Sequence, residues 1–177
     1  MVGACTDTVA GVTSTKPQLV LLGADDAPGP YNLADLEALA DVRQCTVETL
    51  PQVLPGADVL VVWDFFSRAL RDNWGAATQS LRWVHVCAAG VDSLLFDELA
   101  DSDIVVTNAH GVFDQPIAEF VLASILARDK RLHESARLQS AHEWVWRETT
   151  RTAGSSVLVI GTGGIGRAIA RLLRAVG

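Results

Sequence analysis

The stretch Val157-Leu-Val-Ile-Gly-Thr-Gly-Gly-Ile-Gly166 decides how the second half of the chain folds. Four apolar residues lead into glycines spaced as G-x-G-x-x-G, and residues 167–174 follow with apolar side chains at helical spacing. A strand, a glycine turn and a helix in this order form the setting in which such glycines bind the diphosphate of a dinucleotide. The sequence therefore predicts a strand at residues 157–160, a phosphate-binding loop and a helix after it.

Each residue of this glycine loop has a predicted role. Gly161 permits the tight turn, Gly163 lets the backbone approach a diphosphate, and Gly166 lets the helix pack closely. Gly164 and Ile165 are expected to present backbone N–H groups to the cofactor at the positive end of the helix. The alternative is a tight turn that binds nothing. The acidic residue that separates NAD from NADP is expected about 20 residues later, beyond the last residue, so the sequence predicts NAD or NADP without choosing.

Short apolar runs alternate with helical patterns over residues 18–107, which is typical of a parallel sheet covered on both faces. Five strands in this rhythm favour a flavodoxin-like α/β unit, whose ligands lie outside the carboxyl ends of the strands. Those ends are residues 63–65, 88–90 and 108–110. The predicted strands are residues 18–23, 45–50, 57–63, 81–87 and 103–107, with helices from about residues 32 and 67 and over 91–100.

A longer helical pattern begins at Asp114-Gln-Pro116, where proline suits the first turn of a helix. The apolar sector of this helix is wide, which predicts burial between layers or between subunits. Trp144 and Trp146 follow, and we expect them to pack against a neighbouring element. Residues 147–156 are a polar connector.

Composition excludes several classes of protein. The net charge of −7 over 177 residues argues against a nucleic-acid partner. The absence of an uncharged apolar run near 18 residues argues against a membrane span, and the N-terminus does not read as a signal peptide. Cys5, Cys45 and Cys87 are widely spaced without a Cys-x-x-Cys pair. They indicate a reduced, cytoplasmic protein without a metal site.

Three segments together resemble one enzyme family. The first is Leu81-Arg-Trp-Val-His-Val-Cys-Ala-Ala-Gly-Val-Asp92, and the second is Val106-Thr-Asn-Ala-His-Gly-Val-Phe-Asp-Gln-Pro-Ile-Ala-Glu-Phe-Val121. With the glycine loop as the third, their order and spacing resemble those of the D-isomer-specific 2-hydroxyacid dehydrogenases. The resemblance implies NAD(P)-dependent hydride exchange between a nicotinamide and C2 of a small 2-hydroxy or 2-keto acid.

The same resemblance implies a domain layout and a substrate site. Residues 1–17 would be a loose tail, and residues 18–107 a flavodoxin-like substrate domain. Residues 108–177 would hold the interdomain helix and the truncated start of a Rossmann-type cofactor domain, with a homodimer contact through residues 114–146. The backbone N–H groups of Ala89, Gly90 and Val91 would hold the substrate carboxylate, since small residues let an oxyanion approach the backbone.

No catalytic residue is assigned within the chain, because the Arg, Glu and His of the family lie downstream of its glycine loop. Among the histidines, His85 lies within a predicted strand and is expected to be hydrogen-bonded as a structural residue. His110 lies at a strand end near the expected substrate site. Trp63 lies beside that site too, where core packing is the favoured interpretation.

The resemblance further implies that the chain is the N-terminal portion of such an enzyme. On that basis we expect the 177-residue chain to be inactive alone, without useful affinity for NADH. The alternative function is a non-catalytic module that binds small carboxylates or dimerises. A third hypothesis is a flavin-binding protein.

Overall fold

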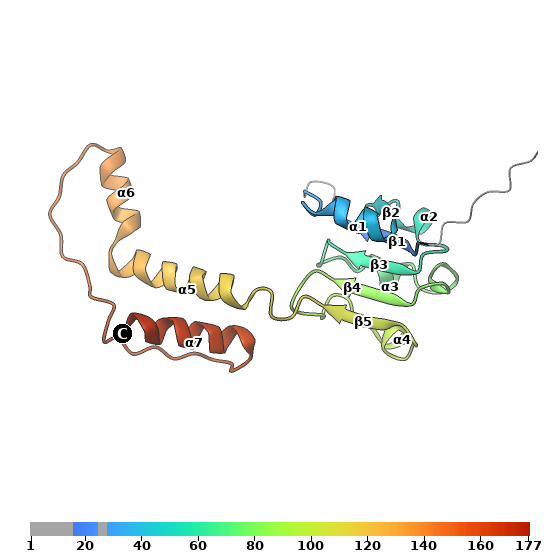
Figure 1. Cartoon of the computed structure of the whole chain (residues 1–177). Helices are drawn as coiled ribbons and strands as arrows, with labels where there is room; N and C mark the ends of the chain where they lie inside the picture. Colours follow the sequence, from blue (N-terminus) through green and yellow to red (C-terminus); the bar gives the residue numbers. More distant parts are fainter. Residues whose placement is uncertain (1–15, 25–27) are drawn as a thin grey trace, which may run out of the picture. The chain divides into compact units, whose positions relative to one another are not determined.

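The computed structural model describes residues 16–24 and 28–177, and most of the predicted N-terminal tail, with Cys5, lies outside this range. The chain divides into two compact units, Met1–Asn108 and Ala109–Gly177. Both are drawn in Figure 1, and each is described below by itself.

Unit 1 is built on a five-stranded parallel sheet (Figure 1). Its order, β2-β1-β3-β4-β5, is the flavodoxin-like order, in which the chain leaves β1 toward one edge and then crosses to the other. This order confirms the predicted fold class. The strands are β1 (Gln18–Leu22), β2 (Asp41–Cys45), β3 (Val59–Val62), β4 (Trp83–Val86) and β5 (Val105–Asn108).

The prediction for the second strand was wrong. The strand runs over Asp41–Cys45 instead of residues 45–50, and Leu50 begins the short helix α2 (Leu50–Val53). The strand β2 pairs only with β1, from Gln18 opposite Asp41 to Leu22 opposite Cys45. An edge strand with partly exposed faces can carry polar residues, so this strand lacks the apolar pattern that marks the others.

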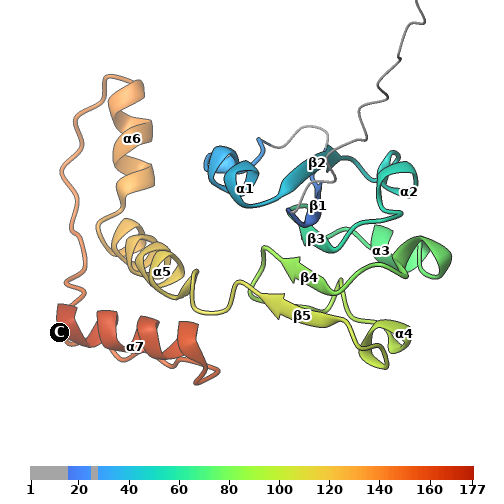
Figure 2. The same cartoon turned by 45° about the vertical axis from the view of Figure 1, so that its right-hand side comes forward.

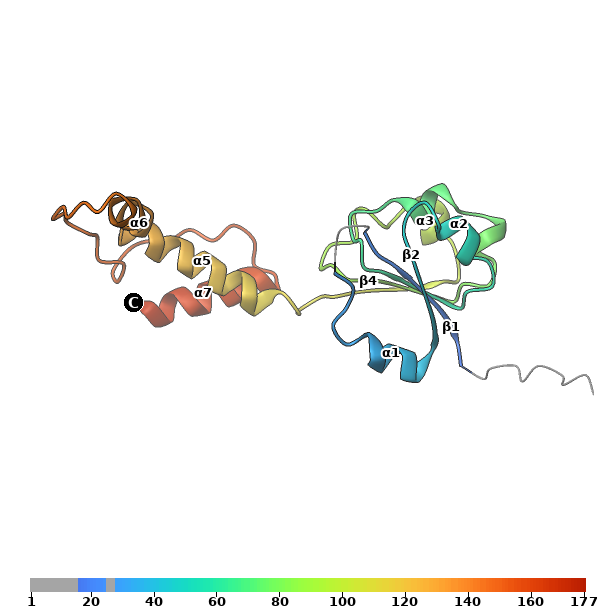
Figure 3. The same cartoon turned by 90° about the horizontal axis from the view of Figure 1, so that it is seen from above.

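Helices cover the two faces of the sheet unequally. The helix α1 (Leu33–Leu39) lies on one face, and α2 and α3 (Ala69–Asp72) lie on the other (Figure 3). Alternate strand residues face the two sides, as the period of a strand requires. The larger core includes Val20, Leu22, Leu50, Leu54, Leu60, Val62, Leu70, Val84, Val86, Phe96 and Leu99, and the smaller one includes Leu19, Leu21, Ala40 and Val59.

The connection between β4 and β5 contains less helix than the sequence predicted. Residues 92–94 form a turn, and the helix α4 (Asp97–Ala100) has only four residues. Leu94 and Leu99 are nevertheless buried in the larger core. Because Leu94 and Leu99 are both buried, the segment carries apolar residues as a helix would, although it forms no continuous helix.

Unit 2 consists of three helices and an extended connector (Figures 1 and 2). The helices are α5 (Asp114–Asp129), α6 (Leu132–Ser140) and α7 (Gly164–Val176). α5 and α7 pack side by side. Arg131 separates α5 from α6 with a left-handed backbone (φ 52°), a conformation that an α-helix does not contain.

Two predictions for unit 2 were wrong. Trp144 and Trp146 do not pack against a neighbour, since their exposed fractions are 96% and 78%. Residues 157–160 form no strand, and Leu158 and Ile160 are largely exposed. A strand requires a partner for its backbone N–H and C=O groups, and no such partner lies beside this segment in the described part of unit 2.

The connector that precedes the glycine loop is fixed to the end of α5. The backbone N–H of Thr150 donates to the Asp129 carbonyl (2.9 Å), and the Thr152 hydroxyl donates to Asp129 Oδ2 (3.0 Å). Arg128 donates to Asp129 Oδ1 through both Nε and Nη2. The hydrogen bonds from Arg128 and Thr152 lower the pKa of the Asp129 carboxyl group. A charged, buried aspartate thus joins α5 to the connector.

Candidate functional site

The loop after β4 lies at the carboxyl edge of the sheet in unit 1. Because all five strands are parallel, the segments that follow β1, β3, β4 and β5 emerge at this same edge. The predicted substrate-binding residues Ala89, Gly90 and Val91 lie here, between the end of β4 and the turn at residues 92–94. They form one contiguous backbone segment.

Hydrogen bonds hold this loop against its neighbours. The Asn108 side chain, at the end of β5, donates from Nδ2 to the carbonyl of Ala89 (2.7 Å). The Ser93 hydroxyl donates to the carbonyl of Phe65, in the segment after β3 (2.5 Å). Both bonds connect segments that are distant in sequence. The loop is therefore positioned by the sheet on two sides.

The loop offers backbone donors for an anion. No residue in the described part of the chain accepts a hydrogen bond from the N–H of Ala89, Gly90 or Val91. Successive unpaired N–H groups form an oxyanion site where the backbone turns so that they converge. One carboxylate oxygen of Asp92 lies 3.2 Å from the position that a Cβ on Gly90 would take. The negative charge of Asp92 would repel an anion that approached the loop from the side of Asp92.

His85 is a structural residue, as predicted. Its Nδ1 lies 2.8 Å from the Thr107 hydroxyl, which also accepts a 2.8 Å hydrogen bond from Trp83 Nε1. An indole N–H can only donate, whereas the Thr107 hydroxyl can donate to His85 Nδ1 or accept from it, according to the tautomer of the imidazole ring. Burial lowers the pKa of His85. His110, in contrast, lies exposed in the turn after β5.

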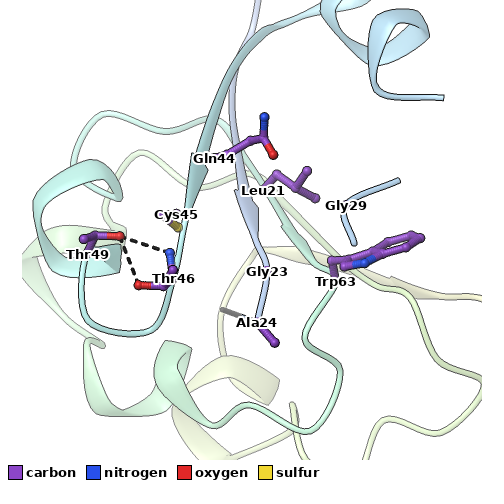
Figure 4. A pocket seen from close by; sticks show the side chains of 9 residues that line it. All are labelled: Leu21, Gly23, Ala24, Gly29, Gln44, Cys45, Thr46, Thr49 and Trp63. Carbon is purple, nitrogen blue, oxygen red and sulfur yellow. Dashed lines mark hydrogen bonds between the residues drawn. The ribbon is translucent and has the colours of Figure 1, made fainter. Parts of the chain in front are cut away.

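A cavity of about 310 Å³ lies at the carboxyl ends of β1, β2 and β3 (Figure 4). Trp63 lines it, held by a hydrogen bond from its Nε1 to the Pro28 carbonyl (3.0 Å), and it also packs against the smaller core. Burial raises the pKa of the Cys45 thiol to about 11, so this lining residue is a neutral thiol and a poor nucleophile. The cavity is lined by Leu21, Gly23, Ala24, Gly29, Gln44, Cys45, Thr46, Thr49 and Trp63.

Sequence reasoning missed the contribution of β2 to this cavity. Thr46 and Thr49 follow β2, and the Thr49 hydroxyl accepts a hydrogen bond from the N–H of Thr46 (3.0 Å; Figure 4). The prediction had placed a strand over these residues. A turn signal was present in the sequence, since threonine side chains readily accept hydrogen bonds from nearby backbone.

The glycine loop of unit 2 has the backbone that its sequence predicts. Gly161 has φ 98°, a left-handed conformation that favours glycine. A Cβ on Gly166 would overlap the carbonyl oxygen of Gly161 and lie 3.0 Å from its carbonyl carbon. A Cβ on Gly163, in contrast, would meet nothing within 4 Å. Two glycines are thus required by the fold of the loop, and the third leaves open space beside the start of α7.

Helix α7 begins at Gly164, with Gly163 as its N-cap residue. The first N–H groups of a helix have no partner within the helix, so those of Gly164 and Ile165 remain for a ligand. Helix α7 carries no acidic residue in its first turn. The loop residues Gly161 and Gly163 are exposed. This helix end is therefore an accessible and positively polarised surface.

One residue beside this helix end was not anticipated from the sequence. The carboxylate of Asp114, the first residue of α5, contacts Gly164, with Oδ1 2.8 Å from the position of an added Cβ. Fifty positions separate the two residues, and the contact follows from the packing of α5 on α7. The sequence showed Asp114 only as a helix start.

Residues 16–24 and 28–177 contain neither a candidate metal site nor a candidate membrane span. Within these ranges, no three His, Cys, Asp or Glu side chains gather in a way that could hold a metal ion. None of the helices described there combines the length and the apolar character that a membrane span requires.

Comparison with known proteins identifies relatives for both units. Residues 122–177 match the family model for the NAD binding domain of D-isomer specific 2-hydroxyacid dehydrogenases. The glyoxylate reductase/hydroxypyruvate reductase of Mus musculus is 30% identical over 167 residues, covering 84% of this chain and 50% of the relative. The glyoxylate reductase of Thermococcus kodakarensis is 27% identical over 152 residues, covering 81% and 45%. The chain thus spans about half the length of the curated relatives it matches.

Solved structures share the fold. A D-isomer specific 2-hydroxyacid dehydrogenase family protein from Aeromonas salmonicida superposes with a TM-score of 0.71 at 24% identity, over 92% of this chain and 52% of that protein. A 2-hydroxyacid dehydrogenase from Ketogulonicigenium vulgare gives a TM-score of 0.66 at 24% identity, over 92% and 52%.

Proposed function

The chain belongs to the D-isomer-specific 2-hydroxyacid dehydrogenase family, and from this premise we propose that it carries two binding loops of an NAD(P)-dependent oxidoreductase. The proposed reaction exchanges a hydride between the nicotinamide and C2 of a small 2-hydroxy or 2-keto acid. The observation that carries the proposal is the glycine loop, in which Gly161 and Gly166 are required by the backbone while Gly163 is not.

The open space at Gly163 supports a dinucleotide at the start of α7. Nothing in the described part of unit 2 comes within 4 Å of a side chain added there. A need for glycine at this position would therefore come from a bound group rather than from the protein. The unpaired N–H groups of Gly164 and Ile165 would donate to the diphosphate of NAD or NADP.

The loop at Ala89, Gly90 and Val91 would hold the substrate carboxylate. Its support is the run of unpaired N–H groups, together with the Asn108 hydrogen bond that fixes the carbonyl of Ala89. Backbone donors held by a sheet are already oriented, so little conformational entropy is lost when an anion binds. Asp92 would turn the rest of the substrate away from its own negative charge.

The residues of this chain contribute binding and orientation. When bound, the nicotinamide would supply or accept the hydride. The β4 loop would fix the carboxylate, and therefore the position of C2 next to it. The start of α7 would fix the diphosphate. A cytoplasmic location is part of the proposal, since Cys45 and Cys87 are free thiols.

Titration of the isotope-labelled chain in solution, followed by amide NMR, tests this proposal. NADH should shift the amide signals of residues 161–166, and glyoxylate those of residues 89–91, because each ligand would accept hydrogen bonds from those N–H groups. The loops alone offer few contacts, so we expect weak binding, with a Kd of about 1 mM.

The two ligands separate the competing functions. Glyoxylate shifts without NADH shifts would favour a carboxylate-binding module over a dehydrogenase. Shifts spread over both units, away from the two loops, would refute the assignment of both sites. An NADH effect that NADPH does not reproduce would identify NAD as the cofactor.

We propose that residues 114–146 form a homodimer contact. Phe120 on α5 has an exposed fraction of 72%, and Trp144 and Trp146 are more exposed still. Large exposed apolar side chains that lie in one segment are typical of protein interfaces. Sedimentation velocity of the chain should show a dimer at micromolar concentration, and W144D/W146D should sediment as a monomer. A wild-type chain that stays monomeric at 100-fold higher concentration would rule the contact out.

A further inference from the structure

Asp114 lies beside the helix end where the proposed cofactor would place its negative charge. Its carboxylate contacts Gly164, the first residue of α7, and Oδ1 lies 2.8 Å from the site of an added Cβ. The diphosphate of a dinucleotide would bind the N–H groups of this same helical turn. A carboxylate and a diphosphate would thus share one helix end.

The surroundings of Asp114 leave its charge uncompensated. Within residues 16–24 and 28–177, no side chain or backbone N–H donates a hydrogen bond to this carboxylate, and no cation forms an ion pair with it. The adjacent Gln115 side chain donates to Glu119 instead. The partial positive charges at the start of its own helix α5 and at the start of α7 are therefore its favourable electrostatic partners.

Resting on the proposed function, we propose that Asp114 is an internal competitor of the cofactor diphosphate and sets the affinity of the loop for dinucleotides. In the ligand-free chain the carboxylate stabilises the start of α7. Two anions within about 5 Å of each other repel strongly at a protein surface. Dinucleotide binding would therefore require the carboxylate to rotate away, and the work of that displacement lowers the affinity.

Substitution of Asp114 by asparagine separates the charge from the shape of the side chain. D114N keeps the size of the residue and a polar group at the first turn of α5. E143Q is the matched control, because it removes one negative charge from unit 2 at an exposed residue remote in sequence from the loop. Circular dichroism and thermal melting of both variants establish that the helices are retained.

The test compares NADH and inorganic pyrophosphate binding to wild type, D114N and E143Q by amide NMR titration of the whole chain. We expect D114N to bind both ligands about tenfold more tightly than wild type, a change of ~1.4 kcal/mol. E143Q should bind as wild type does. Binding by D114N where wild type shows none would support the inference equally.

The remaining outcomes overturn the inference in distinguishable ways. Equal or weaker binding by D114N, with wild-type binding intact, would mean that Asp114 does not compete and that the cofactor site stands. Weaker binding in particular would make Asp114 a group that contacts the cofactor favourably. Failure of all three proteins to bind NADH, NADPH or pyrophosphate would overturn both the inference and the proposed cofactor site.

Discussion

Gly166→Val is expected to weaken NADH binding strongly and to destabilise the start of α7. A Cβ at this position would overlap the carbonyl oxygen of Gly161, and it would lie 3.0 Å from the carbonyl carbon. These are backbone atoms, so relief requires movement of the loop rather than of a flexible side chain. We expect destabilisation of about 1–3 kcal/mol, as for an overpacked site. The displaced N–H groups would lose their charge-assisted hydrogen bonds to the diphosphate. NADH would therefore bind about 10- to 100-fold more weakly.

Gly163→Val is the matched variant on the same loop. Its backbone (φ −70°, ψ −169°) is extended and accepts a side chain, and a Cβ would meet no described atom within 4 Å. It should therefore melt as wild type does and still lose the NADH-induced shifts, because the valine would occupy the space proposed for the diphosphate. Wild-type NADH titration curves for Gly163→Val and Gly166→Val would exclude the loop as the cofactor site.

Leu60→Ala is expected to be the most destabilising change in unit 1. Leu60 lies on the central strand β3, it is fully buried, and it belongs to the larger core. Truncation of a buried leucine removes transfer free energy and leaves a cavity, and it lowers the free energy of unfolding by about 2–5 kcal/mol. That is a large share of the ~5–15 kcal/mol that stabilises a typical domain.

Leu39→Ala removes the same atoms from the end of α1, where the exposed fraction of the side chain is 73%. This control should change the free energy of unfolding by no more than about 0.5 kcal/mol. Urea unfolding, followed through the amide signals of β3 and β4, reports on unit 1 alone. A Leu60→Ala effect no larger than that of Leu39→Ala would show that the larger core tolerates the cavity.

The parts of the fold that could be predicted from sequence are those in which burial fixes the residue type. β3 and β4 are buried between two neighbours, and their valine-rich runs identify them. β2 lies at the edge and reads Asp-Val-Arg-Gln-Cys, which carries no such signal. The position of an edge strand is determined by its pairing with β1, a long-range contact that local pattern does not contain.

The candidate site also has features that the sequence predicts and features that it does not. Left-handed φ at Gly161 and close approach at Gly166 are local backbone requirements, so glycine spacing predicts them. The contact of Asp114 with Gly164 depends on how α5 packs on α7, and nothing near either residue indicates it. Exposure of Trp144 was missed for the same reason, because an aromatic residue type does not say whether a packing partner is present.

The bonds from Thr150 and Thr152 to Asp129 divide the connector between α6 and α7 into two parts with different tolerance to change. The first part, residues 141–146, is exposed throughout, and insertions at exposed loops are tolerated best. Lengthening this exposed part adds only a small entropic term to folding, whereas an insertion beside Trp144 and Trp146 would disturb the proposed homodimer contact. An insertion between residues 150 and 157 would instead lengthen the segment that connects the hydrogen bonds at Asp129 to the glycine loop.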